Sequence, residues 1–385
     1  MNVFQLDKYL DCDLQDLNLN WKEKELPQTV RTKHVHKLHP YFGKFIPQLA
    51  EIFLRRFFSK GETVADPFMG SGTTLVEANL LDMNSIGIDV SEFNCIISKA
   101  KTRNYNIDKL RNEVFGILDR TRNFFLPDAL FKEKIPAESL QTNSKYLNKW
   151  YLEKPLKEIL AYKYFLNDYE YKETLMLIMS RAARSARNIP HYELDHPKDP
   201  VSGPYWCKKH SRMCYPVSEG LKFLEQYSKD TVRRIEEFSA VRKNTAIKII
   251  HSDSRQVKYG EEISGVLTSP PYVGNIDYHR QHEYAYELFG IINNEDKEIG
   301  PMYRGRSKLA VKSYISDISE VLINLKKYLK ENSPIIIVAN DSLNIYPEIF
   351  NTASIKMKHV VNRQVDRRTG RRNLNYSESV FICES

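Results

Sequence analysis

The sequence lacks any apolar run long enough to cross a membrane, since no stretch of its 385 residues approaches 18 consecutive apolar side chains. Residues 1–13 alternate acidic and apolar side chains, which is not the basic-then-apolar pattern of a signal peptide. Cysteine is scarce: the five residues are an odd number and are widely spaced, unlike a disulfide scaffold. We therefore expect a cytoplasmic protein with reduced thiols.

Internal repeats, low-complexity tracts and a strong charge imbalance are also absent. The chain has 57 Lys and Arg against 49 Asp and Glu, a formal net charge of +8. This excess is compatible with a polyanionic partner but does not require one. The 28% charged and 42% hydrophobic residues indicate a globular protein, and the length allows one large core or two smaller ones.

Short apolar runs alternate with helical patterns, in the order typical of a parallel α/β sheet. Helical spacing of apolar residues predicts helices over 45–58 and 315–329. We expect buried strands at 62–68, 85–90, 246–250, 265–268 and 334–339, and a closing hairpin at 360–361 and 379–383. The first two strands flank a glycine turn and a helix over 73–81, which makes a βαβ unit.

The alternation stops between about residues 104 and 244, where long amphipathic stretches rich in Tyr, Lys and Arg replace the short apolar runs. A loop at 188–204 with several prolines and glycines interrupts these stretches. The sequence therefore predicts one discontinuous α/β domain with a mostly helical insertion. The predicted parts are an N-terminal segment over 1–30, the α/β domain over 31–104 and 246–385, and the insertion over 105–245.

The first candidate site is the glycine turn at 66–74, which reads DPFMGSGTT. Gly70 and Gly72 let the backbone approach a ligand closely after a strand. No Lys follows Gly72, which excludes a GxxxxGK[ST] phosphate loop, and a lone GxG also fits a plain tight turn. Asp89 ends the next predicted strand, where its carboxylate can accept ribose hydroxyls or cap the following helix.

The second candidate site is the tetrapeptide Ser269-Pro270-Pro271-Tyr272. It follows the strand at 265–268 and so lies at a carboxyl end of the sheet, where open α/β folds bind ligands. The Ser269 hydroxyl and the Pro270 carbonyl can accept hydrogens from an exocyclic amine, and Tyr272 offers a flat face for stacking a base. A plain proline turn is the alternative.

Together, DPFMGSGTT and the sequence TSPPY at 268–272 resemble the cofactor and catalytic motifs of S-adenosylmethionine-dependent DNA amino-methyltransferases, specifically the cytosine-N4 group. The resemblance implies a Rossmann-like methyltransferase sheet with helices on both faces, interrupted by the helical insertion. It also implies S-adenosylmethionine as the cofactor and double-stranded DNA as a partner, with a cognate restriction endonuclease as a further candidate partner.

The resemblance assigns roles to individual residues. Catalysis would fall to Ser269, Pro270, Pro271 and Tyr272. The segment 36–47 resembles the motif that holds the methionine end of the cofactor. Asp66 would lie near the amino group of the cofactor, Asp89 near its ribose and Asp253 near its adenine. The predicted cofactor-binding residues are Lys44, Phe45, Asp66, Phe68, Gly70, Gly72, Thr73, Asp89 and Asp253.

The expected chemistry is direct methylation of an amine in a flipped-out nucleotide. The chain has no Pro-Cys pair, which argues against cytosine-C5 methylation, where a thiolate adds to the ring. In this family the serine form of the tetrapeptide tends to act on cytosine N4 and an aspartate form on adenine N6. Adenine N6 in DNA, an amine in RNA, and a non-catalytic nucleic-acid-binding protein remain the alternatives.

Three basic clusters are candidates for contacts with DNA phosphates. They comprise Arg181, Arg184 and Arg187; Arg304, Arg306, Lys308 and Lys312; and Arg363, Arg367, Arg368, Arg371 and Arg372. The first cluster has helical spacing and fits a solvated or acid-paired helix face equally well. Base-specific recognition is expected in the insertion, because the motifs of the α/β domain serve the cofactor and the chemistry.

Within the insertion, Cys207, His210 and Cys214 raise a zinc hypothesis. Their spacing is not that of a standard zinc finger, and the sequence shows no second pair of ligands. We therefore expect a basic aromatic loop here and no metal.

Overall fold

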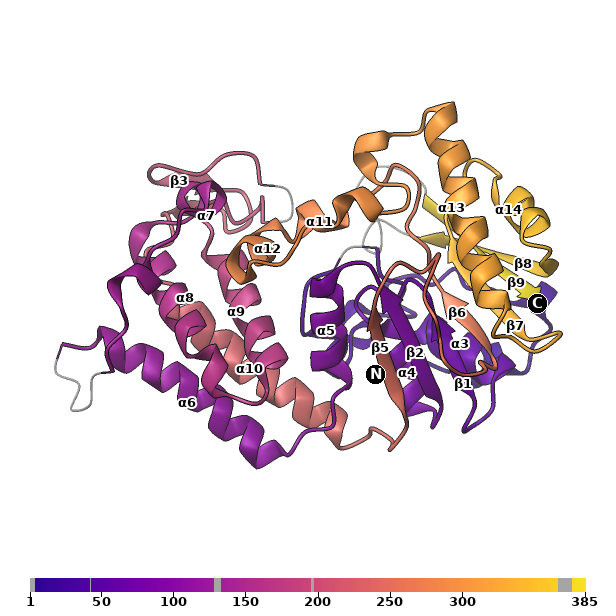
Figure 1. Cartoon of the computed structure of the whole chain (residues 1–385), viewed down its shortest axis with the longest axis horizontal. Helices are drawn as coiled ribbons and strands as arrows, with labels where there is room; N and C mark the ends of the chain where they lie inside the picture. The colour runs from indigo at the N-terminus through magenta and orange to yellow at the C-terminus, as the bar shows by residue number, and fades with distance from the viewer. Residues whose placement is uncertain (1–3, 42, 128–132, 195–196, 366–375) are drawn as a thin grey trace.

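The molecule has two parts, a seven-stranded sheet covered by helices and a group of helices beside it (Figure 1). The computed structural model describes residues 4–41, 43–127, 133–194, 197–365 and 376–385. None of the helices in these ranges is long and apolar enough to cross a membrane.

The sheet has the strand order β5-β2-β1-β6-β7-β9-β8. The first five strands in this order are parallel, and β9 runs antiparallel to both of its neighbours. The strands are β1 Thr63–Asp66, β2 Asn84–Asp89, β5 Ile247–His251, β6 Gly265–Thr268, β7 Pro334–Ala339, β8 Lys356–Val365 and β9 Tyr376–Glu384. The five predicted strands and the closing hairpin are thus confirmed, although the hairpin strands are longer than expected.

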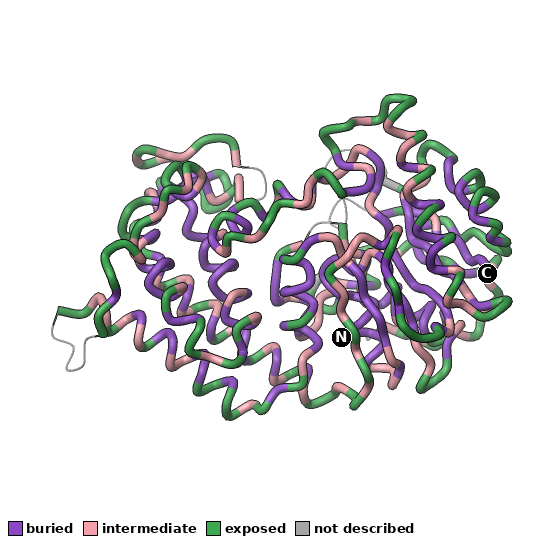
Figure 2. Tube along the Cα trace, viewed as in Figure 1, coloured by how far each residue is buried: buried purple, intermediate pink, exposed green. Residues whose placement is uncertain are grey.

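Alternating side chains of the strands enter separate cores on the two faces of the sheet. Val64 packs with helix α3 on one face, whereas its neighbour Ala65 joins the core formed by α13 and α14 on the other. Figure 2 shows buried residues along the strands and on the helix sides turned toward them. The covering helices are α3 Pro47–Phe57, α4 Thr73–Leu80, α5 Glu92–Thr102, α13 Lys308–Lys326 and α14 Tyr346–Thr352.

The second part is mostly helical, and its core continues into α5 and into α12. Its helices are α6 Ile107–Phe125, α7 Lys145–Trp150, α8 Glu153–Phe165, α9 Lys172–Ala186 and α10 Leu221–Ser239. The chain crosses back toward it through α11 Tyr278–Gln281 and α12 Glu283–Phe289 (Figure 1). A small hairpin that the sequence did not predict, β3 Tyr205–Cys207 with β4 Arg212–Cys214, extends from this part.

The N-terminal segment packs on the α/β part. It includes the short helices α1 Asp7–Leu10 and α2 Gln28–Arg31. Arg56 of α3 donates hydrogen bonds from Nη1 to the carbonyl oxygen of Tyr9 (2.7 Å) and from Nη2 to that of Cys12 (2.8 Å). The N-terminal segment, whose sequence is polar and mixed, is therefore attached to α3, one of the helices that cover the sheet.

The centre of the sheet leaves no room for a side chain at Gly265. A Cβ there would lie 2.5 Å from the carbonyl oxygen of Pro334 and 2.7 Å from Phe58 Cε1. We expect Gly265→Ala to lower the free energy of unfolding by about 1–3 kcal/mol, since overpacking forces neighbouring strands apart. Chemical unfolding followed by circular dichroism measures this. Gly203→Ala is the control, because a Cβ there meets nothing within 4 Å, and equal stability of the two variants would contradict the packing argument.

Candidate active site

A pocket of about 820 Å³, open to solvent, lies at the carboxyl ends of the parallel strands. It unites segments that are far apart in sequence: the motif at 36–47, the glycine turn, the end of β2 and the start of the tetrapeptide. Most of the predicted catalytic and cofactor-binding residues line it, namely Lys44, Phe45, Phe68, Gly70, Thr73, Asp89, Asp253, Ser269 and Pro271. Asp66, Gly72, Pro270 and Tyr272 are not part of its lining.

The glycine turn needs its glycines for both conformation and space. Gly70 and Gly72 have φ angles of 48° and 75°, in the left-handed region that disfavours other residues. A Cβ on Gly70 would lie 2.8 Å from the Tyr41 hydroxyl, and one on Gly72 would lie 2.8 Å from Ser98 Oγ. The turn therefore runs directly against Tyr41 and α5.

Helix α5 holds the turn through two buried polar side chains that the sequence did not single out. Ser98 Oγ donates to the carbonyl oxygen of Gly70 (3.1 Å), and Lys101 Nζ donates to that of Ser71 (2.7 Å). Burial, and then the charge of Lys44, lower the pKa of Lys101. In the sequence, the position of Lys101 among the apolar residues that follow β2 was the signal that this lysine holds the turn.

Asp89 is positioned by donors from the turn and from α5. Its Oδ2 accepts from the Gly70 amide (2.9 Å), and its Oδ1 accepts from the Ser91 amide (2.8 Å) and from Asn94 Nδ2 (3.0 Å). Burial raises the pKa of Asp89 to about 6, although these hydrogen bonds oppose the shift. The carboxylate is thus fixed in place at the pocket with part of its acceptor capacity unused.

Asp66 lies behind the pocket lining. Its Oδ1 accepts from Thr268 Oγ1 (2.6 Å) and from the Phe68 amide (3.1 Å), which ties the end of β1 to the end of β6. Burial raises the pKa of Asp66 to about 6.

Asp253 lines the pocket but is already paired. Arg255 donates to Asp253 from Nε to Oδ1 (3.0 Å) and from Nη2 to Oδ2 (2.6 Å), and it also bonds Asp317. Partial burial would raise the pKa of Asp253, but the hydrogen bonds from Arg255 outweigh it and lower the pKa. A ligand that contacts Asp253 would therefore share its carboxylate with Arg255.

Lys44 contributes a partly buried amine to the pocket lining. Its Nζ donates to the carbonyl oxygen of His36 (2.8 Å), and burial lowers its pKa to about 8.

Ser269 presents its lone pairs to the pocket. Its Oγ donates to the carbonyl oxygen of Val338 on the neighbouring strand β7 (2.9 Å), so the hydroxyl proton is committed and the oxygen is left as an acceptor. The Pro271 carbonyl oxygen accepts from the buried Tyr314 hydroxyl (2.8 Å). The tetrapeptide is therefore anchored on both sides by β7 and α13.

Tyr272 is more buried than the stacking prediction suggests, with 8% of its surface exposed. Its hydroxyl donates to Glu378 Oε1 (3.1 Å), and Arg363 Nε donates to Oε2 of the same glutamate (2.7 Å). One edge of the ring thus faces β8 and β9. Arg363, from the third predicted basic cluster, is engaged in this buried pair.

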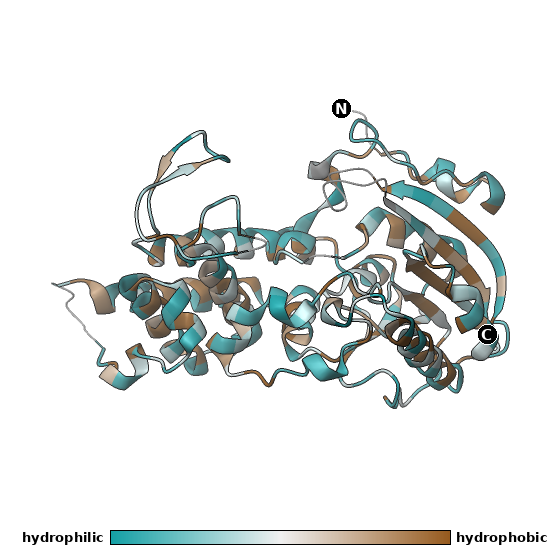
Figure 3. Ribbon diagram, turned by 90° about the horizontal axis from the view of Figure 1, so that it is seen from above, coloured by the Kyte–Doolittle hydropathy of each residue, from teal (hydrophilic) through white to brown (hydrophobic). Residues whose placement is uncertain are grey.

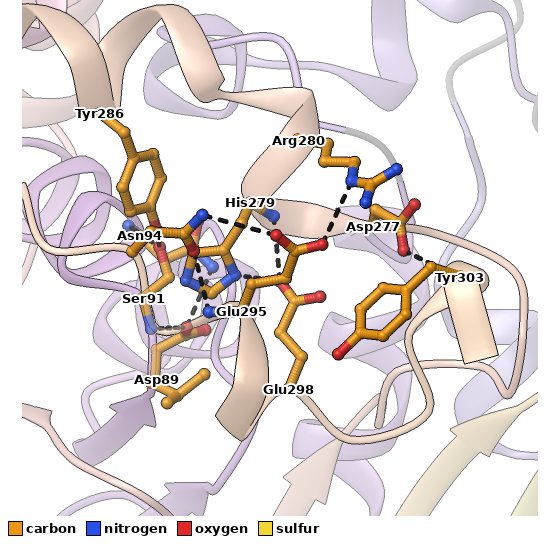
Figure 4. A network of polar contacts seen from close by, with 12 residues as sticks. Asp89, Ser91, Asn94, Asp277, His279, Arg280, Tyr286, Glu295, Glu298 and Tyr303 are labelled. Atoms are coloured by element: carbon orange, nitrogen blue, oxygen red, sulfur yellow. Dashed lines mark hydrogen bonds and ion pairs between the residues drawn. The ribbon is translucent and has the colours of Figure 1, made fainter. Parts of the chain in front are cut away.

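The segment after the tetrapeptide contributes Tyr278, Glu298 and Ile299 to the pocket lining. Figure 4 shows the polar contacts that hold this segment. His279 Nδ1 and Glu298 Oε1 form a buried hydrogen-bonded pair, and the Tyr303 amide donates to Asp277 Oδ1 (3.2 Å). Tyr286 reaches the end of β2, where its hydroxyl hydrogen-bonds Ser91 Oγ (2.6 Å). This network links the pocket wall to the residues around Asp89.

The basic clusters differ in their availability for DNA. Arg181 is buried and donates to Asp230 (2.6 Å), and the buried Arg187 donates to the carbonyl oxygen of Leu194 (2.7 Å). Arg181 thus matches the acid-paired alternative, and Arg187 is bound to the backbone of the loop after α9. The cluster around Arg304 and Arg306 is exposed. The remaining predicted arginines, Arg367, Arg368, Arg371 and Arg372, lie outside the described residues.

Known DNA methyltransferases resemble the chain over 70–98% of its length. A family model described as DNA methylase matches residues 8–100. The type II methyltransferase M.MjaII of Methanocaldococcus jannaschii is 40% identical, over 98% of this chain and 83% of its own. The chain belongs to the DNA amino-methyltransferases. The type II methyltransferases M.BsoBI of Geobacillus stearothermophilus and M.MvaI of Kocuria varians match at 24% and 25% identity, over 71% and 70% of this chain and 56% and 58% of their own.

The methyl donor of this type II DNA methyltransferase is S-adenosylmethionine, and the residues of the pocket fit it. Ser71 Oγ, Thr73 Oγ1 and Asn94 Oδ1 line the pocket and are buried without a hydrogen-bond partner among the described residues. The amino end of α4 begins at the turn, where helix amides favour an anionic group such as a carboxylate. The pocket thus offers unpaired polar groups for a polar cofactor.

The raised pKa of Asp89 predicts a pH dependence of cofactor binding. An ionised carboxylate accepts ribose hydroxyls better than a protonated one, so affinity should fall as the pH drops below about 6, by up to about tenfold per unit. Isothermal titration calorimetry between roughly pH 5 and pH 7 measures this. Asp89→Asn should bind weakly with no such dependence. If the dependence persists in that variant, the titrating group is another one, such as Asp66, whose pKa is also about 6, and the assignment of the pH dependence to Asp89 is wrong.

Proposed function

We propose that this DNA methyltransferase transfers the methyl group to the exocyclic N4 amine of a cytosine flipped out of double-stranded DNA. The observation that carries the proposal is the orientation of Ser269: its proton is bonded to the Val338 carbonyl, and it lines the same pocket as Asp89 and the glycine turn. A hydrogen-bond acceptor, Ser269 Oγ, therefore lies at the pocket that the cofactor would share with the target base.

The residues of the tetrapeptide would activate a poor nucleophile. The lone pair of the cytosine amine is delocalised into the ring, so the enzyme must favour the pyramidal form that can attack. Hydrogen bonds from the amine to Ser269 Oγ and to the Pro270 carbonyl would do this. The bound cofactor supplies the electrophilic methyl group. Stacking of the base on Tyr272 stays a prediction from the motif, because this side chain is buried and does not line the pocket.

Asp89 would orient the ribose of the cofactor. A carboxylate has about four acceptor positions, and three are filled by Gly70, Ser91 and Asn94. The remaining position, on Oδ2, is our candidate for a ribose hydroxyl. Lys44, Phe45, Phe68 and Thr73 would complete the cofactor site from the pocket wall.

DNA would approach at the side of the pocket that carries Arg304 and Arg306. A Cβ on Gly274, two residues after Tyr272, would lie 2.7 Å from the Gly305 carbonyl oxygen, so the loop of these arginines abuts the catalytic segment. We retain residues 105–245 as the target-recognition region. The similarity to type II methyltransferases supports a restriction-modification role with a cognate endonuclease.

The product identifies the base. Nucleoside mass spectrometry on DNA from a methylation-free host expressing the protein should detect N4-methylcytosine. A Ser269→Ala variant should lower methyl transfer by at least about 100-fold, because the transition state loses a hydrogen bond, while cofactor affinity measured by calorimetry stays unchanged.

Other products would each revise the proposal. N6-methyladenine would keep the site but overturn the base assignment. Absence of any modified base would direct the search to RNA or to a role in binding only. A loss of cofactor affinity in Ser269→Ala would show that the division between catalytic and cofactor-binding residues is wrong.

Arg304 provides a test of the DNA surface. Arg304→Ala should weaken DNA binding and lower the slope of log affinity against log salt concentration by about 0.9, the value for one phosphate contact. Lys330→Ala is the matched control, because Lys330 is exposed, pairs with Glu262 and precedes β7 at the amino ends of the parallel strands, away from the pocket. Fluorescence anisotropy at several salt concentrations measures both slopes, and equal slopes would contradict the proposed surface.

A further inference from the structure

Four potential metal ligands meet at the β3–β4 hairpin, far from the pocket. They are His191, Cys207, His210 and Cys214, and their ligand atoms all lie within 4.8 Å of one another. Cys207 ends β3, Cys214 ends β4, His210 lies in the turn between them, and His191 comes from the loop after α9. The sequence alone gives only the last three, because nothing in its pattern connects His191 with the hairpin.

The distances match the edges of a zinc tetrahedron. Cys207 Sγ lies 3.8 Å from His191 Nδ1, and Cys214 Sγ lies 3.5 Å from His210 Nδ1. With Zn–S bonds of about 2.3 Å and Zn–N bonds of about 2.0–2.1 Å, a tetrahedral site separates sulfur from nitrogen by about 3.6 Å. The side chains are therefore spaced as ligands around a central ion.

The hairpin has almost no core of its own. Each strand has three residues, and a two-stranded hairpin of this size is marginal in water. Trp206, Met213 and Tyr215 are 57%, 49% and 69% exposed, whereas Cys207 and Cys214 are buried. Figure 3 shows the hairpin projecting from the helical part. Its buried side chains are thus the two potential thiolate ligands, and apolar packing does not explain its shape.

We propose that His191, Cys207, His210 and Cys214 bind one Zn²⁺ in a structural site that joins the β3–β4 hairpin to the loop after α9. Four protein ligands leave no open position for a substrate, as in structural zinc sites. Binding releases the thiol protons, and the two thiolates then neutralise the charge of the ion. This proposal departs from the expectation of a loop without metal, which was drawn from the spacing of three residues.

Metal analysis of the untagged protein, purified without chelators, tests the site directly. We expect one zinc per chain by inductively coupled plasma mass spectrometry. Removal of the zinc and reconstitution with Co²⁺ should produce the visible absorption of a tetrahedral cobalt-thiolate centre. This spectrum comes from the unaltered chain and so does not depend on whether a variant folds. Absence of zinc together with a Cys207–Cys214 disulfide in the peptide mass spectrum would overturn the proposal.

Variants assign the ligands. Cys207→Ser should lose the zinc, and His191→Ala should lower zinc affinity by more than about tenfold, because even outer-shell partners contribute that much. Cys12→Ser is the control: Cys12 is a free, half-buried cysteine in the N-terminal segment and should retain one zinc. Stoichiometric zinc in Cys207→Ser would place the metal elsewhere and refute the site.

Discussion

The fixed backbone of the glycine turn is the constraint on which the rest of the pocket depends. Gly70 is held from two directions, since its carbonyl oxygen accepts from Ser98 and its amide donates to Asp89. Lys101 fixes the next carbonyl, that of Ser71. The hydrogen bond between the Gly70 amide and Asp89 therefore fixes the glycine turn and the end of β2 relative to each other. The two halves of the βαβ unit together form one preorganised surface.

The order of strands extends this constraint to the second half of the chain. Strand β6 lies beside β1, although the whole helical part separates them in sequence. The bond from Thr268 to Asp66 joins the carboxyl ends of the two strands, so Ser269 begins at the edge of the glycine turn's pocket. The insertion does not disturb this arrangement because its core is built on α5, which already packs against the sheet.

Local sequence patterns predict the helices and strands whose formation depends mainly on their own residues. The short apolar runs at 85–90 and 334–339 correspond closely to β2 and β7, because buried parallel strands need continuous apolar residues. Helix α14 and the β3–β4 hairpin were missed, since their residues become ordered through distant contacts. The glycine turn and the tetrapeptide were recognisable as motifs, whereas Ser98, Lys101 and the burial of Tyr272 depend on neighbours that no spacing in the sequence reveals.

Two lysines lie near the proposed methionine end of the cofactor site: Lys44 in the pocket lining and Lys101 behind the glycine turn. Lys101 is buried and Lys44 is partly buried, and among the described residues neither forms an ion pair. The nearby Glu77 is already paired with His36 and Lys33. Burial and mutual repulsion therefore disfavour the two ammonium charges in the free protein. A carboxylate bound at the amino end of α4 would supply the missing counter-charge, so its binding would be coupled to protonation of Lys44, whose pKa in the free protein is about 8.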